Sequence, residues 1–246
     1  ANRADSSNAL RQIMVAYNAY SADAEQMLMP GFISASAQST LGITTKVDDS
    51  IIDGEDAESI VWRLAPYLSE GDWRPYFIDY RHRRLAERIA SEIGDEIYGP
   101  GSAGATDLGA ARVPSFGLNS IYMGGDDVNG SAAFRDRAPW GPDAASRLAA
   151  TRLSEVKNAA RVVVFGPTEY WDNGMPFDPP PFTDIRFGAP ELRAPRVAGE
   201  AQWEILAGTL ECSDAGGTFG AYSGWLVARW SQEELPVSHL DGSVTT

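Results

Sequence analysis

The sequence predicts an α+β fold in which an N-terminal helix packs on a mainly antiparallel β-sheet. Three observations predict this class. Residues 2–24 have helical spacing, the chain from there to residue 97 is patterned as helix and loop, and strand patterns dominate after residue 110. Because we find neither internal repeats nor a domain linker, we expect one domain with three parts: the end of a longer helix (1–24), a large variable helical and loop insertion (25–110) and a β-rich part (111–246).

Composition and charge limit the classes of function. The chain has 246 residues, of which 43% are hydrophobic and 22% charged, so it is long and apolar enough to bury a core. Its formal net charge of −14 disfavours nucleic acid and anionic membrane surfaces as partners, because both would repel it. The same charge would suit the binding of hard cations.

The N-terminal helix is predicted by an apolar stripe at i, i+3, i+4 and i+7, formed by Leu10, Ile13, Met14 and Tyr17. We expect this stripe to act as a structural spine that packs on the sheet. The helical pattern already runs at Asn2 without a convincing N-cap, and the chain has no initiator Met. These features predict that a preceding segment is removed. Helical structure should end before Pro30-Gly31.

Further elements follow in chain order. We expect loop or short strands at 31–54, then helices at Glu55–Ser69 and Tyr80–Ile97, the first shortened or kinked by Pro66. The glycine-rich stretch 99–109 reads as a loop. In the β-rich part we expect strands, short helices, a proline-rich loop and a closing hairpin with its turn at Asp241-Gly242. These are assigned to strands at 115–122, 161–165, 225–230, 235–240 and 243–245, short helices within 143–158, and the loop 171–195.

Common catalytic motifs are weak or absent. The two histidines, His82 and His239, are too few for a typical zinc site, and no H-E-x-x-H motif or Cys pair occurs. His239 lies near Asp241, but this pair precedes a turn, which favours a structural role. The stretch 99–104 matches G-x-G-x-x-G, yet a helix precedes it where a dinucleotide site needs a strand. Cys212 reads as a small buried apolar side chain.

Calcium is the cofactor that the sequence favours, if any is bound. Asp126, Asp127 and Asn129 offer three oxygen-bearing side chains next to Gly130. A second acidic cluster follows at Asp172, Asn173, Asp178 and Asp184. Neither cluster matches a full EF-hand loop, and solvated Asx turns explain both equally well.

Abundant carboxylates and seven tryptophans leave an alternative function open. Two carboxylates suffice for glycoside hydrolysis, and tryptophans stack on sugar rings. However, Trp62 and Trp225 lie in amphipathic patterns typical of a core. A secreted glycan-binding module or a carboxylate-dependent glycoside hydrolase is therefore the alternative reading.

Four segments, in order along the chain, carry a family resemblance. They are 7–31 (S-N-A-L-R-Q-I, A-Y-N-A-Y and L-M-P-G), 114–120 (P-S-F-G-L-N-S), 151–165 (T-R-L-S-E-V followed by R-V-V-V-F) and 239–244 (H-L-D-G-S-V). Together they resemble the planctomycete-type pseudopilin-like proteins that carry a prepilin-type N-terminal cleavage and methylation signal. The chain departs from the family pattern at Ser231, where members often have His, and it lacks their central C-P-S-D element.

The resemblance implies a pilin-like domain and a structural, non-catalytic role. Such a protein is a subunit or minor component of a pseudopilus, as in type II secretion, or of a type IV pilus-like filament. Its partners are other pseudopilins or pilin-like subunits. It is extracytoplasmic, in the periplasm or at the cell surface, and its precursor is anchored in the inner membrane by an N-terminal apolar helix absent from these residues. In type II secretion the major pseudopilins bind calcium through a C-terminal loop, but no residue here matches that motif.

Overall fold

The fold is that of a computed structural model, which describes residues 2–31, 33, 35, 38–39, 45–47, 50–52, 54, 56–68, 73–78, 111, 114–120, 122–125, 150–167, 203–207, 224–228 and 236–245. Several predicted features lie outside these residues. They are the helix at 80–97, the loops at 99–109 and 171–195, both acidic clusters, Cys212 and Ser231.

The long N-terminal helix, α1 (Asn2–Asp23), is present almost as predicted. It ends at Asp23, within one residue of the predicted span 2–24 and before Pro30-Gly31. Glu25 and Gln26 adopt positive φ angles of 51° and 65° and turn the chain away from the helix axis, and the Gln26 N–H donates to the Ser21 carbonyl (2.7 Å).

The predicted second helix is broken into short pieces, in keeping with a disruptive Pro66. A 3-10 turn, η1 (Asp56–Glu58), precedes α3 (Ile60–Leu64), and Pro66 lies in a second 3-10 turn, η2 (Ala65–Tyr67). Ser59 caps α3, since its hydroxyl oxygen accepts from the Val61 N–H. A further short helix, α4 (Arg74–Phe77), was not predicted. These pieces form the helical layer of the molecule.

A four-stranded antiparallel sheet contains most of the predicted β-structure. Its order is β3-β4-β7-β8, with β3 at Phe116–Leu118, β4 at Val163–Pro167, β7 at Val237–His239 and β8 at Val244–Thr245. The predicted turn at Asp241-Gly242 joins β7 to β8, with Gly242 at φ 87°. Two 3-10 turns precede β4, namely η5 (Leu153–Glu155) and η6 (Ala159–Arg161). Because η6 occupies 159–161, β4 begins two residues later than predicted.

Two small sheets complete the strands. The predicted short strands appear as an antiparallel pair, β1 (Thr45–Val47) and β2 (Ser50–Ile52). β6 (Gly224–Ala228) confirms the predicted strand near 225–230, but it pairs in parallel with β5 (Trp203–Ala207), which was not predicted. The described strands are thus mainly antiparallel with one parallel pair, and the α+β class holds.

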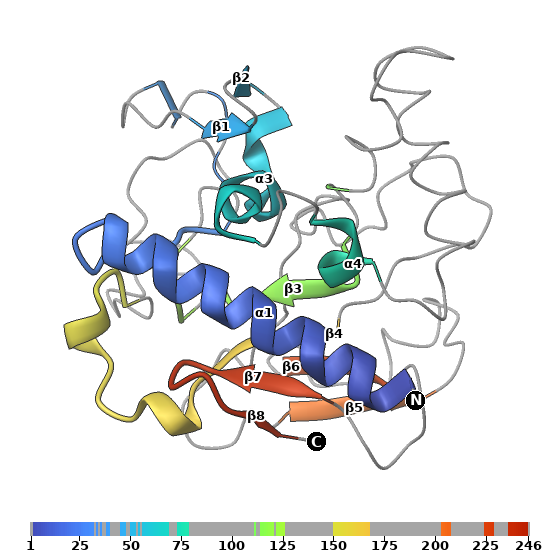
Figure 1. The fold of residues 1–246 in the computed structure, drawn as a ribbon. Coiled ribbons are helices and arrows are strands. Elements are labelled where there is room, and N and C mark those ends of the chain that lie inside the picture. Colours follow the sequence, from blue (N-terminus) through green and yellow to red (C-terminus); the bar gives the residue numbers. More distant parts are fainter. Residues whose placement is uncertain are drawn as a thin grey trace, which may run out of the picture.

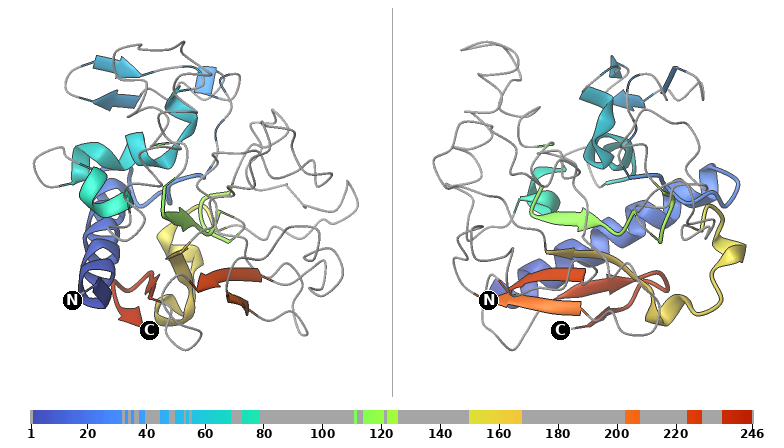
Figure 2. Two further views of the ribbon diagram at one scale, coloured as in Figure 1. Left: turned by 90° about the vertical axis from the view of Figure 1, so that its right-hand side faces the viewer. Right: turned by 180° about the vertical axis from the view of Figure 1, so that it is seen from behind.

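Helix α1 lies between two layers (Figure 1). The four-stranded sheet packs against one side of it through β4, β7 and β8, and the helical layer contacts it through α3, η2 and α4. The two rotated views agree on this arrangement (Figure 2). The buried core joins all three layers. The sheet and the helical layer together bury one side of α1, and the other side is exposed.

Candidate functional site

The predicted spine is the centre of the molecule. Leu10, Ile13, Met14 and Tyr17 are all essentially inaccessible to solvent. The Tyr17 ring meets Phe165 of β4 edge to face, with ring centroids 5.6 Å apart, and burial raises the pKa of the Tyr17 hydroxyl. The stripe thus packs on the sheet as expected.

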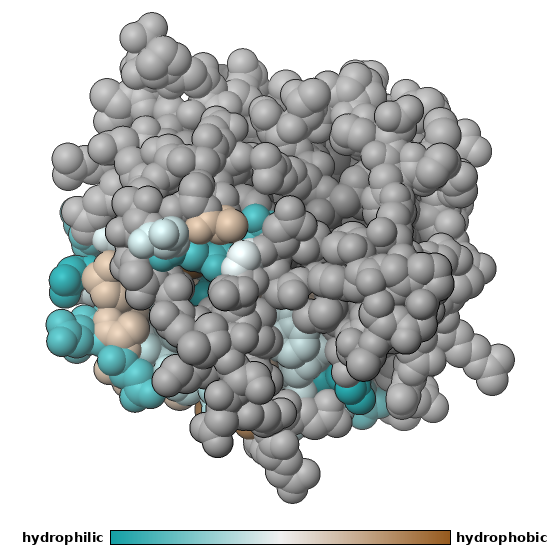
Figure 3. Space-filling model, turned by 90° about the horizontal axis from the view of Figure 1, so that it is seen from above, coloured by the Kyte–Doolittle hydropathy of each residue, from teal (hydrophilic) through white to brown (hydrophobic). Residues whose placement is uncertain are grey.

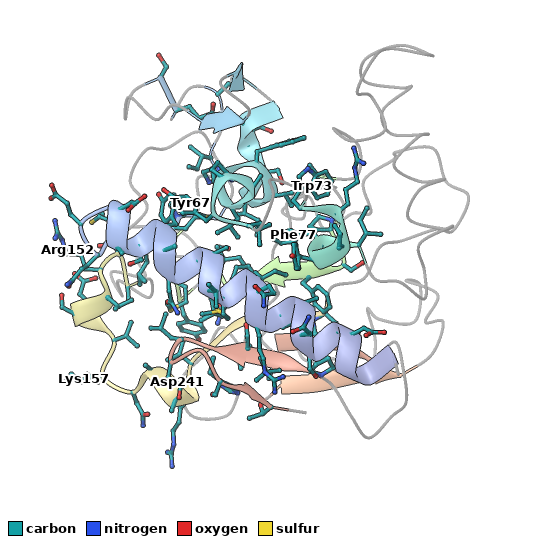
Figure 4. All side chains as sticks on the ribbon, in the orientation of Figure 1. Tyr67, Trp73, Phe77, Arg152, Lys157 and Asp241 are labelled. Carbon is teal, nitrogen blue, oxygen red and sulfur yellow. The ribbon has the colours of Figure 1, made fainter. Side chains whose placement is uncertain are left out.

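The helical layer covers a second face of α1. Tyr20 packs edge to face against Tyr67 of η2, with centroids 5.9 Å apart. Trp62 and Trp73 pair in the same way at 5.5 Å, and both are buried. Tyr67, Trp73 and Phe77 lie on this side of α1 (Figure 4). What remains of the helix surface is an exposed stripe that contains Asp5, Asn8, Arg11, Val15, Asn18 and Ala22.

Arg63 of α3 is a buried cation that fastens the helical layer to the chain leaving α1. Its guanidinium donates to the carbonyl oxygens of Ala57 (3.1 Å) and Glu58 (3.3 Å) through Nη1, and to those of Pro30 (2.7 Å) and Gly31 through Nη2. Within the described part of the chain, its Nε–H has no acceptor. Burial lowers the pKa of Arg63 to about 10. Carbonyl dipoles therefore hold this charge and tie two segments together.

The segment that follows α1, residues 26–31, is hydrogen-bonded to two other segments of the chain. Leu28 N–H donates to the Thr151 carbonyl (2.8 Å), and Leu153 N–H donates to the Gln26 carbonyl (3.0 Å). Farther along, Gly31 N–H donates to the carbonyl of Gly125 (2.7 Å). These bonds fix the path of residues 26–31, of which Leu28 and Met29 are buried in the core.

Gly124 permits the closest of these approaches. Its φ is 78°, and a Cβ at this position would overlap the carbonyl of Met29 and lie 2.8 Å from the Pro30 nitrogen. Only glycine fits between these backbones without a shift of one of them.

The histidine and aspartate of the C-terminal hairpin serve its structure. A ring nitrogen of His239, Nε2, lies 2.7 Å from the Thr245 hydroxyl across the hairpin. The Asp241 carboxylate accepts from the N–H (2.9 Å) and hydroxyl (2.7 Å) of Ser243. Hydrogen bonds from Ser243 hold the pKa of Asp241 below its usual value.

The predicted calcium ligands Asp126, Asp127 and Asn129 lie outside the described residues, as does the second acidic cluster. The described ranges themselves contain no group of three or more His, Cys, Asp or Glu side chains that could hold a metal ion. Among the same residues, no helix is both long and apolar enough to cross a lipid bilayer.

Sequence patterns identified the spine but missed Arg63 and Gly124. Arg63 follows Trp62 in an apparently ordinary amphipathic helix, and no local signal distinguishes a buried arginine from a solvated one. Gly124-Gly125 was a detectable turn signal. Its partner segment, Met29-Pro30, is far away in sequence, so the close contact was not predictable.

Comparison with known proteins found no similar protein. The chain matches no protein-family model, no curated protein and no solved structure.

Proposed function

We propose that this protein is a structural, non-catalytic subunit or minor component of a pseudopilus or type IV pilus-like filament. The observation that carries the proposal is the position of the four segments that resemble pseudopilin-like proteins. These segments, 7–31, 114–120, 151–165 and 239–244, contain most of α1, all of β3, the first three residues of β4 and the hairpin turn between β7 and β8. A resemblance scattered along the sequence thus maps to one spatial unit, the helix and the sheet beneath it.

The helical layer fits the proposal as an insertion. It comes from residues 56–77, between the first and second of the four segments, and it packs on α1 through α3, η2 and α4. An insertion at this point leaves the pairing of α1 with the sheet intact. A pilin-like domain with one enlarged loop region accounts for this arrangement.

The proposal also defines partners and location. The partners are other pilin-like subunits, and the protein acts outside the cytoplasm while its precursor is held in the inner membrane by an apolar helix that precedes Ala1. The exposed stripe of α1, which includes Arg11 and Val15, is the surface of this helix that is left open to a neighbouring subunit.

The alternative glycan-related functions gain no support from Trp62 and Trp73, the tryptophans whose side chains the structure describes. Trp62 and Trp73 are buried against each other, so neither ring face is open to a sugar. Turnover on a panel of glycosides, or binding on a glycan array, would restore that alternative.

The decisive experiment follows processing of the precursor. The full-length gene should encode a basic leader ending in Gly, then Phe-Thr-Leu-Ile-Glu or a close variant and about 20 apolar residues. Co-expression with a prepilin peptidase should shorten the precursor, and changing the leader glycine to a bulky residue should block this. The matched control is an inactive peptidase. A conventional signal peptide, cleaved by signal peptidase, would refute the proposal.

The same cells should also be tested for assembly. Sheared surface or periplasmic filament fractions should contain the processed wild-type protein. Val15→Cys, on the exposed stripe of α1, should give disulfide-linked dimers in that fraction, in a Cys212→Ser background that leaves one thiol per subunit. Ser154→Cys, exposed on η5 and not on α1, is the control and should stay monomeric. Processed protein that never enters a filament would contradict the structural role.

A further inference from the structure

The chain immediately after α1 is in conflict with its own sequence. Residues 24–29 read Ala-Glu-Gln-Met-Leu-Met, and all five residue types are among the best helix formers. Yet α1 ends at Asp23, and Glu25 and Gln26 adopt left-handed φ angles of 51° and 65°. Residues other than glycine, asparagine and aspartate rarely adopt this backbone conformation, because their Cβ crowds the following carbonyl.

The apolar pattern of α1 also continues past its end. Counting on from Tyr17, the positions i+4, i+7 and i+11 are Ser21, Ala24 and Leu28. A helix continued through residue 29 would therefore keep Leu28 on the buried stripe. The first step of such a continuation is already present, since Ala24 N–H donates to the Tyr20 carbonyl at 2.8 Å.

Tertiary hydrogen bonds hold the segment out of the helix. The Leu28 N–H donates to the Thr151 carbonyl, and the Gln26 carbonyl accepts from the Leu153 N–H. Between these two bonds, Met27 and Arg152 form an isolated antiparallel β-bridge. Leu28 and Met29 are buried, whereas Glu25 and Gln26 are exposed. Seen from above, the surface over this end of α1 mixes polar and apolar residues (Figure 3). The strained turn thus lies at the surface, and its clamp is the segment 151–153.

We infer that residues 24–29 are a conformational switch, which joins α1 as additional helix when the segment 151–153 releases them. The conversion lengthens α1 by about 9 Å along its axis. It relieves the left-handed backbone at Glu25 and Gln26, and it draws the chain toward α1, because helical residues span less than half the length of extended ones. This inference concerns the folded chain alone and does not depend on a role in filaments.

The switch is tested by removing one hydrogen bond between residues 24–29 and the segment 151–153. Leu153→Pro removes only the N–H that bonds to Gln26, since Leu153 is the first residue of η5, where proline is tolerated. The preceding residue, Arg152, is extended at φ −129° and ψ 148°, as a residue before proline must be. Leu153→Ala is the matched control, because it shortens the partly exposed side chain but keeps the N–H.

The readouts are amide hydrogen exchange and Cα chemical shifts of residues 24–29 in the full chain. In Leu153→Pro, exchange of the Leu28 amide should rise about tenfold, as loss of one backbone hydrogen bond implies, and the Cα shifts should move toward helical values. Leu153→Ala should resemble the wild type. Shifts that stay unchanged, or that move to random-coil values instead, would overturn the inference.

A second variant acts on the strain itself and does not require the clamp to open. Gln26→Gly removes the steric cost of φ 65°, so it should slow exchange at residues 26–28 and raise the melting temperature. Ala22→Gly, at an exposed helical position of α1, should do the opposite. Equal losses of thermal stability in the two variants would show that residue 26 stores no strain.

Discussion

Replacing Gly124 with alanine tests the close approach of its backbone to Met29 and Pro30. An added Cβ would overlap the Met29 carbonyl and lie 2.8 Å from the Pro30 nitrogen, where ordinary contacts exceed 3.4 Å. The left-handed φ of 78° costs an alanine about 1–2 kcal/mol. Relief of the overlap requires the two backbones to separate, which typically costs about 1–3 kcal/mol in a packed interior.

The separation would also strain neighbouring hydrogen bonds. Gly124 N–H donates to Ala150 (2.8 Å) and Gly31 N–H donates to Gly125 (2.7 Å). Each such bond contributes about 0.5–1.5 kcal/mol when it is lost. We therefore expect Gly124→Ala to reduce the free energy of unfolding by about 3–5 kcal/mol. Against a typical total of about 5–15 kcal/mol, this is a large loss.

The assay is urea unfolding followed by tryptophan fluorescence, since Trp62 and Trp73 are buried and should report loss of the core. Gly54→Ala is the matched control: its φ is 60°, but an added Cβ would have no neighbour within 4 Å. It should cost about 1–2 kcal/mol from backbone strain alone. If the two variants unfold at the same urea concentration, the close approach of Gly124 to Met29 is wrong.

Three further substitutions test the spine, the buried cation and the hairpin. Ile13→Asp should cost more than about 4 kcal/mol by placing a charge in the core and leave the chain largely unfolded by circular dichroism, whereas Val15→Asp, whose side chain is 60% exposed, should melt within a few degrees of the wild type. Arg63→Lys should lower the free energy of unfolding by about 2–3 kcal/mol in the same urea assay, because one ammonium group cannot replace a guanidinium that donates to both the Ala57 and the Pro30 carbonyls. An unchanged free energy of unfolding would show that these carbonyls need no donor. Because the pKa of Asp241 is lowered in the folded state, its stabilising contribution is present above the unfolded-state pKa and is lost as pH falls through the folded-state value. Asp241→Asn should therefore flatten the dependence of melting temperature on pH below about pH 4. An unchanged profile would contradict the hydrogen bonds from Ser243.

Local patterns predicted the elements whose residues decide their own conformation. The stripe Leu10, Ile13, Met14 and Tyr17 repeats at the helical period, so its buried face was readable before any partner was known. Asp241-Gly242 likewise specifies a tight turn, because glycine adopts a positive φ without steric cost. Pro66 correctly indicated a disrupted helix.

Other features depend on residues that are distant in sequence. The parallel pairing of β5 with β6 was not predicted, because strand direction is decided by the path of the chain between them and not by the strand residues. The proposed calcium ligands Asp126, Asp127 and Asn129 lie outside the described residues and stay a prediction, as does a role in a filament.

By itself, the sequence determined that residues near 2–23 form an amphipathic helix, that residues near 237–245 form a hairpin and that the chain combines helices with β-strands, because periodicity and turn chemistry are properties of neighbouring residues. Only the tertiary structure decided the path of the chain that leaves α1. Residues 24–29 favour helix locally, yet hydrogen bonds to Thr151 and Leu153 and the burial of Leu28 and Met29 hold them outside it. Contacts between distant segments can outweigh local preference because helix propensities differ by only tenths of a kcal/mol per residue, whereas a buried side chain contributes about 1.5–3 kcal/mol.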